Sequence, residues 1–475
     1  MALNPAQDPV LHLLRRATYG PTPALAAEVR KAGTTAWLDA QLNPLTQVPD
    51  TAMDTLARRY PRQGLAIWQA RDQLAADSRW DLMQETVDLH IARAAWSRRQ
   101  LLEVMADFWS NHLNVTCPSS DVWDSRHRYA QDVIRRHALG SFSDLLVASA
   151  RHPAMLSYLD NASSSKKAPN ENHGRELLEL HTVGVDGGYA EKDVRTSALL
   201  LTGLSVDSDS GEYEYKPIRR YVGPLSILGF SSPNASAVNG EAVAVAYLRH
   251  LARHPATARR IATKLAIRFV SDNPPATLVN RLATAYLSHD TAIAPVLRML
   301  FASAEFAASA GNKVRTPFED CVATLRILGV QPPAAGTTAL RQLAWAVAGA
   351  GQAPLRWPAP NGYPDVAAAW SGSSGTLSRW NFHLSRAAGW YPSDLVHQPP
   401  RSLLPTTLPG TYGALVDVLS ARLLLPALTA GQKDAVCAFV DATPAKALKS
   451  TDTALGWRLP YVVALLLDSP NFAIR

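Results

Sequence analysis

Hydrophobic side chains recur every three or four positions along most of the chain, which is the spacing of one buried helix face. The longest such run covers residues 80–105 and predicts one continuous helix with a single buried face. Shorter helices are predicted where a proline or capping residue opens a periodic run and a glycine closes it, as over 23–31 before Gly33. The pattern therefore predicts an all-α protein.

Two stretches depart from the helical spacing. Residues 204–230 contain a short alternating segment, 212–215, between glycines and prolines, which predicts a small β-hairpin excursion. Residues 354–375 are rich in proline, glycine and aromatic residues and predict a long irregular loop. Such a loop is typical of a binding surface, although loops of this composition also simply pack against the protein body.

A chain of 475 residues is longer than one hydrophobic core usually extends, so several packed subdomains are expected. We expect an N-terminal helical subdomain over 1–203, the hairpin excursion over 204–239, a middle helical subdomain over 240–335 and a C-terminal helical subdomain over 336–475. All four are expected to pack as one compact unit.

Composition narrows the possible partners. The net charge is +7, but the basic residues occur as scattered pairs without a stripe, so nucleic-acid binding is not expected. No apolar run reaches the roughly 20 residues that cross a bilayer, so no membrane span is expected either. Arg15 and Arg16 precede no apolar segment, which predicts a cytoplasmic protein as numbered, or an exported one if a signal was removed before numbering. Three distant cysteines suggest buried free thiols.

The segment 170–193 concentrates charge in an otherwise ordinary sequence, with six acids against two bases. Asn170 suits a helix N-cap and Gly184 a left-handed C-cap, so a helix is predicted over 171–183. At 100° per residue, Asn172, Glu176 and Glu179 fall on one stripe of that helix. His181 falls on the other side.

Two chemical interpretations of this stripe remain open. Glu176 and Glu179 are close enough to couple their titrations or to bind one divalent cation, and His112, which ends the segment 108–112, could serve as base or ligand. The stripe could instead be a solvated surface with an Arg175 to Glu179 pair, and His112 a histidine hydrogen-bonded at a helix end.

The first function hypothesis is an enzyme with a polar cleft, centred on carboxylates or on a divalent metal ion and acting on a small or polymeric substrate. Its catalytic or metal-binding residues would be Glu176, Glu179 and His112. Eight further side chains would support them: Asn170, Glu171, Asn172, Arg175, Asp160, Asn161, Glu191 and Asp193. The alternative is a non-catalytic helical binding or assembly protein whose polar motif satisfies buried backbone groups.

Several stretches together resemble one known family. They are 13–21, 108–112, 153–161, 254–259, 264–265 and, above all, the motif residues Asn170, Glu171, Asn172, Arg175, Glu176, Leu177, Glu179 and Leu180. The chain resembles the mainly bacterial family catalogued as domain of unknown function 1800. The resemblance implies frequent export and a partner protein from a neighbouring gene, but no settled activity.

The chain departs from that family pattern at three places. Ser110 stands where a histidine is common, and Ala190 stands where a capping threonine usually precedes the acidic pair. Arg220 and Tyr221 replace a common histidine and aspartate. If the family's histidines complete a metal site, the resemblance implies that this chain has lost or altered it.

Overall fold

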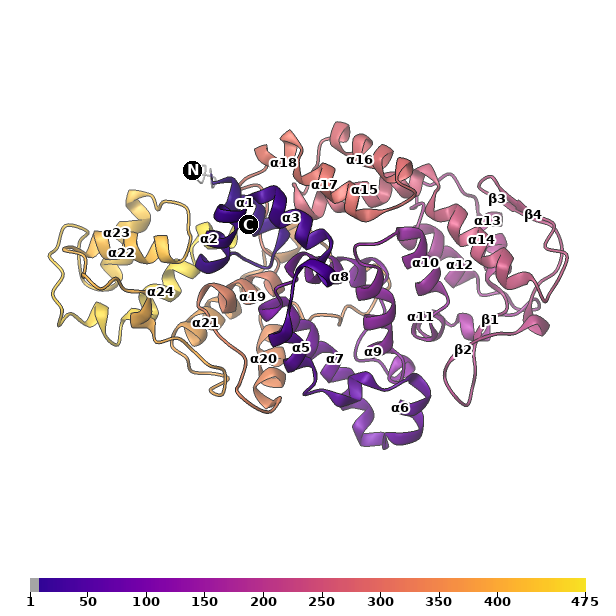
Figure 1. Cartoon of the computed structure of the whole chain (residues 1–475), viewed down its shortest axis with the longest axis horizontal. Helices are drawn as coiled ribbons and strands as arrows, with labels where there is room; N and C mark the ends of the chain where they lie inside the picture. Colours follow the sequence, from indigo (N-terminus) through magenta and orange to yellow (C-terminus); the bar gives the residue numbers. More distant parts are fainter. Residues whose placement is uncertain (1–7) are drawn as a thin grey trace.

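The computed structural model describes residues 8–475, and they form a helical protein, as the hydrophobic spacing predicts. The first seven residues of the expected 1–203 subdomain lie outside this range. Figure 1 shows an elongated molecule with helices α22 to α24 at one end and strands β1 to β4 at the other. Within residues 8–475, no helix is both long and apolar enough to cross a membrane.

The first half of the chain supplies short helices and one long pair. These helices are α1 (Pro9–Ala17), α2 (Pro23–Ala32), α3 (Thr34–Leu42), α4 (Pro44–Gln47), α5 (Thr51–Ala57), α6 (Ile67–Gln73), α7 (Ala76–Trp96), α8 (Gln100–His112), α9 (Arg126–Arg128), α10 (Phe142–Ala150), α11 (Pro153–Tyr158), α12 (Glu171–Glu176) and α13 (Glu191–Leu201). Two π-helical segments follow α9 and α12, at Tyr129–Arg135 and Leu177–His181.

The second half continues in the same way after the strands. Its helices are α14 (Gly240–Ala252), α15 (Pro255–Phe269), α16 (Ala276–Ser288), α17 (Ile293–Phe301), α18 (Ala304–Ala308), α19 (Pro317–Ile327), α20 (Thr338–Gly349), α21 (Ser373–Ala387), α22 (Tyr412–Arg422), α23 (Ala430–Phe439), α24 (Leu459–Leu467) and α25 (Pro470–Ala473). The predicted loop over 354–375 lies between α20 and α21 and carries one helical turn, Ala367–Trp370.

The prediction of one continuous helix over 80–105 is wrong, because two helices cover this range. α7 ends at Trp96, and α8 begins at Gln100 after Ser97 adopts an extended conformation. The Ser97 hydroxyl donates to Asp50 at 2.6 Å, and the Arg98 backbone N–H donates to the same carboxylate at 3.1 Å. Asp50 therefore satisfies backbone and side-chain donors at a break that the hydrophobic spacing on either side does not reveal.

The excursion over 204–230 forms two hairpins rather than one. β1 (Leu204–Val206) pairs antiparallel with β2 (Tyr213–Tyr215), and β3 (Leu225–Ile227) pairs antiparallel with β4 (Phe230–Ser232). Buried Arg220 holds this region to the end of α13, since it donates to the Thr202 carbonyl at 3.2 Å and to Asn234 Oδ1 at 2.8 Å. Arg220, one of the residues at which this chain departs from the family that it resembles, thus contributes to the fold here.

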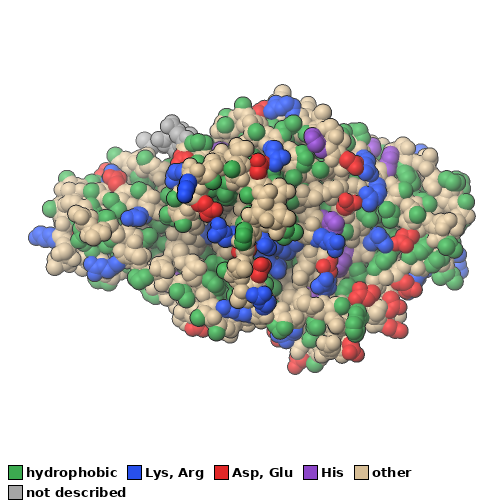
Figure 2. Space-filling view, in the orientation of Figure 1, with side chains coloured by type: hydrophobic (Ala, Val, Ile, Leu, Met, Phe, Trp, Pro, Cys, Tyr) green, Lys and Arg blue, Asp and Glu red, His purple; other side chains and the backbone are tan. Residues whose placement is uncertain are grey.

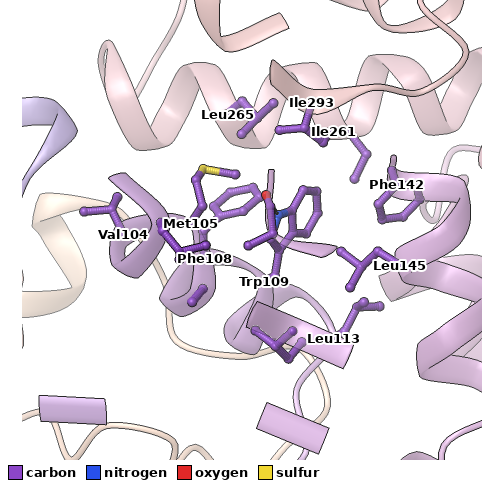
Figure 3. Packing of buried hydrophobic residues seen from close by; sticks show 14 of the residues in the cluster. Val104, Met105, Phe108, Trp109, Leu113, Phe142, Leu145, Ile261, Leu265 and Ile293 are labelled. Carbon is purple, nitrogen blue, oxygen red and sulfur yellow. Dashed lines mark hydrogen bonds between the residues drawn. The ribbon is translucent and has the colours of Figure 1, made fainter. Parts of the chain in front are cut away.

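One hydrophobic cluster runs through most of the molecule, from Leu13 to Leu395, and crosses the boundaries of the expected subdomains. At its centre the Trp109 side chain is fully buried, and Figure 3 shows it beside Phe142, below the helices that carry Ile261 and Ile293. A second cluster, between residues 323 and 472, gathers the C-terminal helices. The three cysteines are free and buried. The subdomain boundaries themselves stay a prediction.

The motif helix is shorter than the predicted 171–183. Asn170 caps α12 as expected, because its Oδ1 accepts the His173 backbone N–H at 3.0 Å. From Leu177 the backbone widens into the π-helical segment, which ends at His181. Gly184 adopts φ +86° and its N–H reaches the Leu178 carbonyl at 2.9 Å, so the predicted C-cap is present. The widened turn leaves the last carbonyls of the helix to side-chain donors.

Candidate active site

A pocket of about 490 Å³ lies between the C-terminal end of α8, the face of α15 and the loop between α20 and α21. Its polar lining side chains are Asp107, Asn111, His112, Lys264, Arg268, Thr316, Gln352, Asn361 and Asp365, and its rings are Phe108, Trp357 and Tyr363. Figure 2 shows lysine and arginine side chains gathered across the middle of the face in view. A smaller pocket of about 390 Å³ beside α2 and α3 has a mainly apolar lining.

The aromatic loop forms one wall of the larger pocket and is held in place by backbone contacts. Asn114 Nδ2 donates to the carbonyls of Trp357 and Ala359 at 2.9 and 2.7 Å. Gly362 packs against α8 so closely that an added Cβ would stand 2.0 Å from the Asn111 carbonyl oxygen, and its φ is +69°. Only glycine fits there without moving the wall.

His112 lies at the end of α8 and is 2% exposed. Its Nε2 lies 3.1 Å from the His181 carbonyl oxygen, so Nε2 carries the proton and donates. Nδ1 then bears the lone pair, which accepts a hydrogen bond from Lys264 Nζ at 3.0 Å. Burial first, and then the charges of Lys264 and Arg260, hold the pKa of His112 well below its ordinary value of 6.5. The ring is therefore neutral, in one tautomer.

Lys264 is half-buried on α15, and its amine opens on the pocket. Within residues 8–475, its one hydrogen bond is to His112, and no carboxylate pairs with it. Burial, reinforced by the charge of Arg260, lowers the pKa of the Lys264 amine from 10.5 to about 7. Near neutral pH a large fraction of this amine is therefore unprotonated and able to accept a proton.

Arg260 completes the contact between α15 and the π-helical segment. Its Nε and one terminal nitrogen lie 3.3 Å from the Leu180 carbonyl oxygen. Arg260 and His112 thus cap adjacent carbonyls, those of Leu180 and His181. The widened end of the motif helix is therefore what fixes the tautomer of His112 and, through it, the position of the Lys264 amine.

One turn further along α15, Arg268 belongs to a buried ionic network. Its guanidinium lies 2.7 Å from Glu319 and 3.5 Å from Asp365, while Lys313 lies 2.7 Å from Asp272 and 3.1 Å from Asp365. Arg475 pairs with Glu319 and Asp365 as well. Three cations thus face three carboxylates. Burial opposes charge here, but Glu319 and Asp365 outweigh it and raise the pKa of Arg268.

The two predicted carboxylates lie outside this pocket. Glu176 is half-buried and has neither a hydrogen bond nor an ion pair with any residue that the structure describes. Burial and the charge of Glu179 raise its pKa above 4.5, against the opposing charge of Arg175. Glu179 accepts a hydrogen bond from the Tyr189 hydroxyl at 2.7 Å and lies 3.5 Å from Arg175. The coupling of Glu176 to Glu179 is thus present, whereas no contact joins either to His112.

Most of the supporting residues hold the fold together. Asn170 Nδ2 donates to the Leu159 carbonyl at 2.7 Å, and Asn161 Nδ2 donates to the Leu204 carbonyl at 3.1 Å. Glu171 pairs with Arg195, Glu191 pairs with Arg175, and the Asp193 carboxylate caps the Ala190 N–H. Asn172 and Asp160 are exposed.

No group of three or more histidine, cysteine, aspartate or glutamate side chains suited to a metal ion occurs in the part of the chain that the structure describes. Both ring nitrogens of His112 are already engaged, by the His181 carbonyl and the Lys264 amine. In this arrangement His112 has no lone pair left for a metal. The proposed joint site of Glu176, Glu179 and His112 stays a prediction.

The site predicted from the sequence does not include Lys264, Arg268, Gln352 or the loop side chains, although Lys264 lies in one of the stretches, 264–265, that resemble the family. A signal for two of them exists in the sequence: Arg260, Lys264 and Arg268 recur every four residues on a helix that is otherwise largely apolar. Cations on the buried face of a helix are rare without partners or function. Nothing local marks Gln352.

Comparison with known proteins agrees with the motif evidence. The sequence profile of the family described as protein of unknown function (DUF1800) matches residues 12–474. The chain belongs to this DUF1800 family. No curated protein and no solved structure matches the chain. The DUF1800 description assigns no activity.

Proposed function

We propose that this DUF1800 protein is an enzyme whose central group is the Lys264 amine, acting as a general base and acid on a substrate held in the pocket. The observation that carries the proposal is a cation on a pocket wall with a neutral histidine as its hydrogen-bond partner and no carboxylate among the described residues. A half-buried cation without a counter-charge weakens the fold, so its presence on a cavity wall favours a chemical use.

Each side chain in the pair has a distinct part in this chemistry. The unprotonated Lys264 amine takes a proton from the substrate, and the ammonium that forms returns it to a later species. His112 is a positioning residue: its Nδ1 lone pair orients one N–H of the amine while the His181 carbonyl keeps the ring from turning. Positioned acid–base groups of this kind typically contribute about 10² to 10⁴ in rate.

Amine reactivity at defined pH tests the proposal without knowledge of the substrate. The folded protein is treated with trace acetic anhydride between pH 5 and 11, and each lysine is quantified by peptide mass spectrometry. Lys264 should become reactive with a midpoint near pH 7. The exposed Lys31 and Lys192 serve as internal controls that become reactive several pH units higher. A Lys264 profile that follows these controls, or no labelling of Lys264, overturns the proposal.

A second candidate keeps the catalytic carboxylates of the motif. Glu176 is a half-buried carboxyl with a raised pKa and no partner among the described residues, which suits a general acid or, with Glu179, a ligand for a divalent cation. Calorimetric titration with Mn²⁺ distinguishes this candidate, since binding should be lost in Glu176→Gln. Absence of Mn²⁺ binding at millimolar concentration counts against the metal version.

The non-catalytic alternative is supported by the motif's structural contacts. Asn161 and Asn170 satisfy backbone carbonyls, and Arg175 and Arg195 each pair with a glutamate across the contact between α12 and α13. A binding protein working with a partner from a neighbouring gene would need no reactive lysine. The labelling profile of Lys264 therefore separates it from the enzyme proposal as well.

A further inference from the structure

The polar groups of the pocket differ in whether their hydrogen bonds are already made. Among its side-chain acceptors, Asp107 Oδ1 lies 3.0 Å from His90, and Asp365 contacts Lys313, Arg475 and Arg268. Asn111 Oδ1 accepts the Tyr363 backbone N–H at 3.1 Å. The strong acceptors on the wall are therefore committed to the protein.

Several donors on the same wall lack a protein partner. Gln352 is only 5% exposed, and its Oε1 accepts the Phe318 N–H at 3.1 Å, which leaves its amide NH₂ without an acceptor among the described residues. Asn361 Oδ1 accepts the Trp357 indole N–H at 2.7 Å, and the amide NH₂ of Asn361 likewise has no acceptor among the described residues. The Lys264 amine has N–H groups beyond the one given to His112. A ligand bound in this pocket would therefore face hydrogen-bond donors that are free to bind it.

The loop contributes aromatic rings rather than hydrogen-bond donors, and these rings indicate the shape of the rest of the ligand. The Trp357 and Tyr363 rings lie with centroids 4.9 Å apart at 52°, and Phe108 lines the pocket from α8. Such rings pack against flat or ring-shaped bodies and supply apolar contact area. The pocket thus combines an aromatic wall with unsatisfied donors that include a cation.

From this combination we infer that the substrate is an organic oxyanion with a ring-shaped body, its anionic oxygens received by Lys264 and Gln352 and its ring lying against Trp357 and Tyr363. The inference rests on the proposed function, because it places the ligand at the same amine. An acceptor-rich head group would satisfy the donors that have no acceptor among the described residues, and its charge would pair with the ammonium form of Lys264, the form that acts as the general acid in the proposed function. Carboxylates, phosphate esters and sulfate esters all carry anionic oxygens of this kind.

Binding of small matched probes to the full-length protein tests the inference. Benzoate, phenyl phosphate and phenyl sulfate are compared with neutral benzyl alcohol by isothermal titration calorimetry and saturation-transfer NMR at pH 6.5. At least one anion should bind tenfold or more tightly than the alcohol, and the tightest identifies the head group. Lys264→Met should remove that preference. Gln352→Glu, which keeps an acceptor for the Phe318 N–H but adds a negative charge, should weaken anion binding at least tenfold.

Trp357→Leu should weaken the binding of the anions and of benzyl alcohol alike. Lys192→Met, a change on the surface, should leave all of these affinities unchanged. Thermal melts establish that each variant is folded. Equal affinity for anions and alcohol, or an anion preference that survives in Lys264→Met, overturns the inference. This failure is distinguishable from failure of the proposed function: Lys264 would still label near pH 7 in the first case and would not in the second.

Discussion

Lys264 and Arg268 lie one turn apart on α15, both facing inward, and their environments are opposite. Arg268 meets Glu319 and Asp365, and these carboxylates raise its pKa. Lys264 meets the neutral ring of His112, and its pKa falls to about 7. Burial disfavours both charges, so the difference comes from the supply of counter-charge rather than from depth.

The comparison separates structural charge from reactive charge. The network around Arg268 joins α15, α19, the pocket loop and Arg475, with each cation balanced by a carboxylate. It therefore fixes the walls of the pocket. Lys264 lies inside those walls without such compensation, which leaves its proton easily exchanged. A rigid, charge-balanced frame around one unbalanced group is an arrangement that suits catalysis.

The largest expected effect comes from removing a carboxylate from the ionic network around Arg268. Glu319→Gln should lower the free energy of unfolding by about 3 to 5 kcal/mol at pH 7, because Arg268 and Arg475 would lose a buried counter-charge. Burial raises the pKa of Glu319, but Arg268 and Arg475 outweigh it and lower that pKa below 4.5. Its contribution is therefore present above pH 4.5 and is lost as the pH falls below that value. Urea unfolding between pH 3 and 7 measures both effects.

Glu305→Gln is the matched control for Glu319. Glu305 also pairs with an arginine, Arg281 at 2.8 Å, but on the surface, where such pairs contribute less than about 1 kcal/mol. Similar losses for the two variants would contradict the picture of a buried network that holds the pocket walls.

A smaller effect of opposite sign is expected on the unbalanced side. Lys264→Met should raise the free energy of unfolding by about 2 kcal/mol at pH 6. This is less than the full pKa shift would give at about 1.4 kcal/mol per pKa unit, because the amine is partly solvated and its hydrogen bond to His112 is lost. The Lys264 pKa is lower in the folded state, so charging it opposes folding. That penalty is complete below pH 7 and disappears as the pH rises through 10.5.

The gain in Lys264→Met should therefore shrink between pH 7 and 10.5 in urea unfolding experiments. Lys264→Arg retains the charge and should show no gain at any pH. Destabilisation by Lys264→Met at pH 6 would mean that the amine already has compensation, and the contrast with Arg268 would fail.

The smallest effect is expected at Glu176, which, like Lys264, has no ion-pair partner among the described residues but is less buried. Glu176→Gln should stabilise the protein by no more than about 0.5 kcal/mol at pH 7, with the difference vanishing below pH 4.5, because its raised pKa means that charging it opposes folding. Glu179→Gln should destabilise slightly, since it weakens the contact with Arg175. Thermal melts at pH 7 and pH 4 compare the two, and equal signs would contradict this assignment.

The sequence by itself determined the helical class, the caps of the motif helix and the approximate place of the hairpins and the aromatic loop. These features depend on local spacing and on backbone preferences of residues such as Asn170 and Gly184, which act within a few positions. It also singled out His112. It could not separate α7 from α8, because the break depends on Asp50, far away in the chain.

Only the tertiary structure decided which charges are balanced. Glu176 and Glu179 stand out in the sequence because acids cluster there, yet Glu179 and most of its neighbours find partners within the same region. In the sequence, Lys264 stands out only as part of a short family-like stretch, and nothing there indicates an unusual charge. Folding makes it exceptional, because it places the amine against His112, more than 150 positions away, with no carboxylate paired to it among the described residues. Electrostatic environment depends on long-range neighbours, and local spacing carries no record of them.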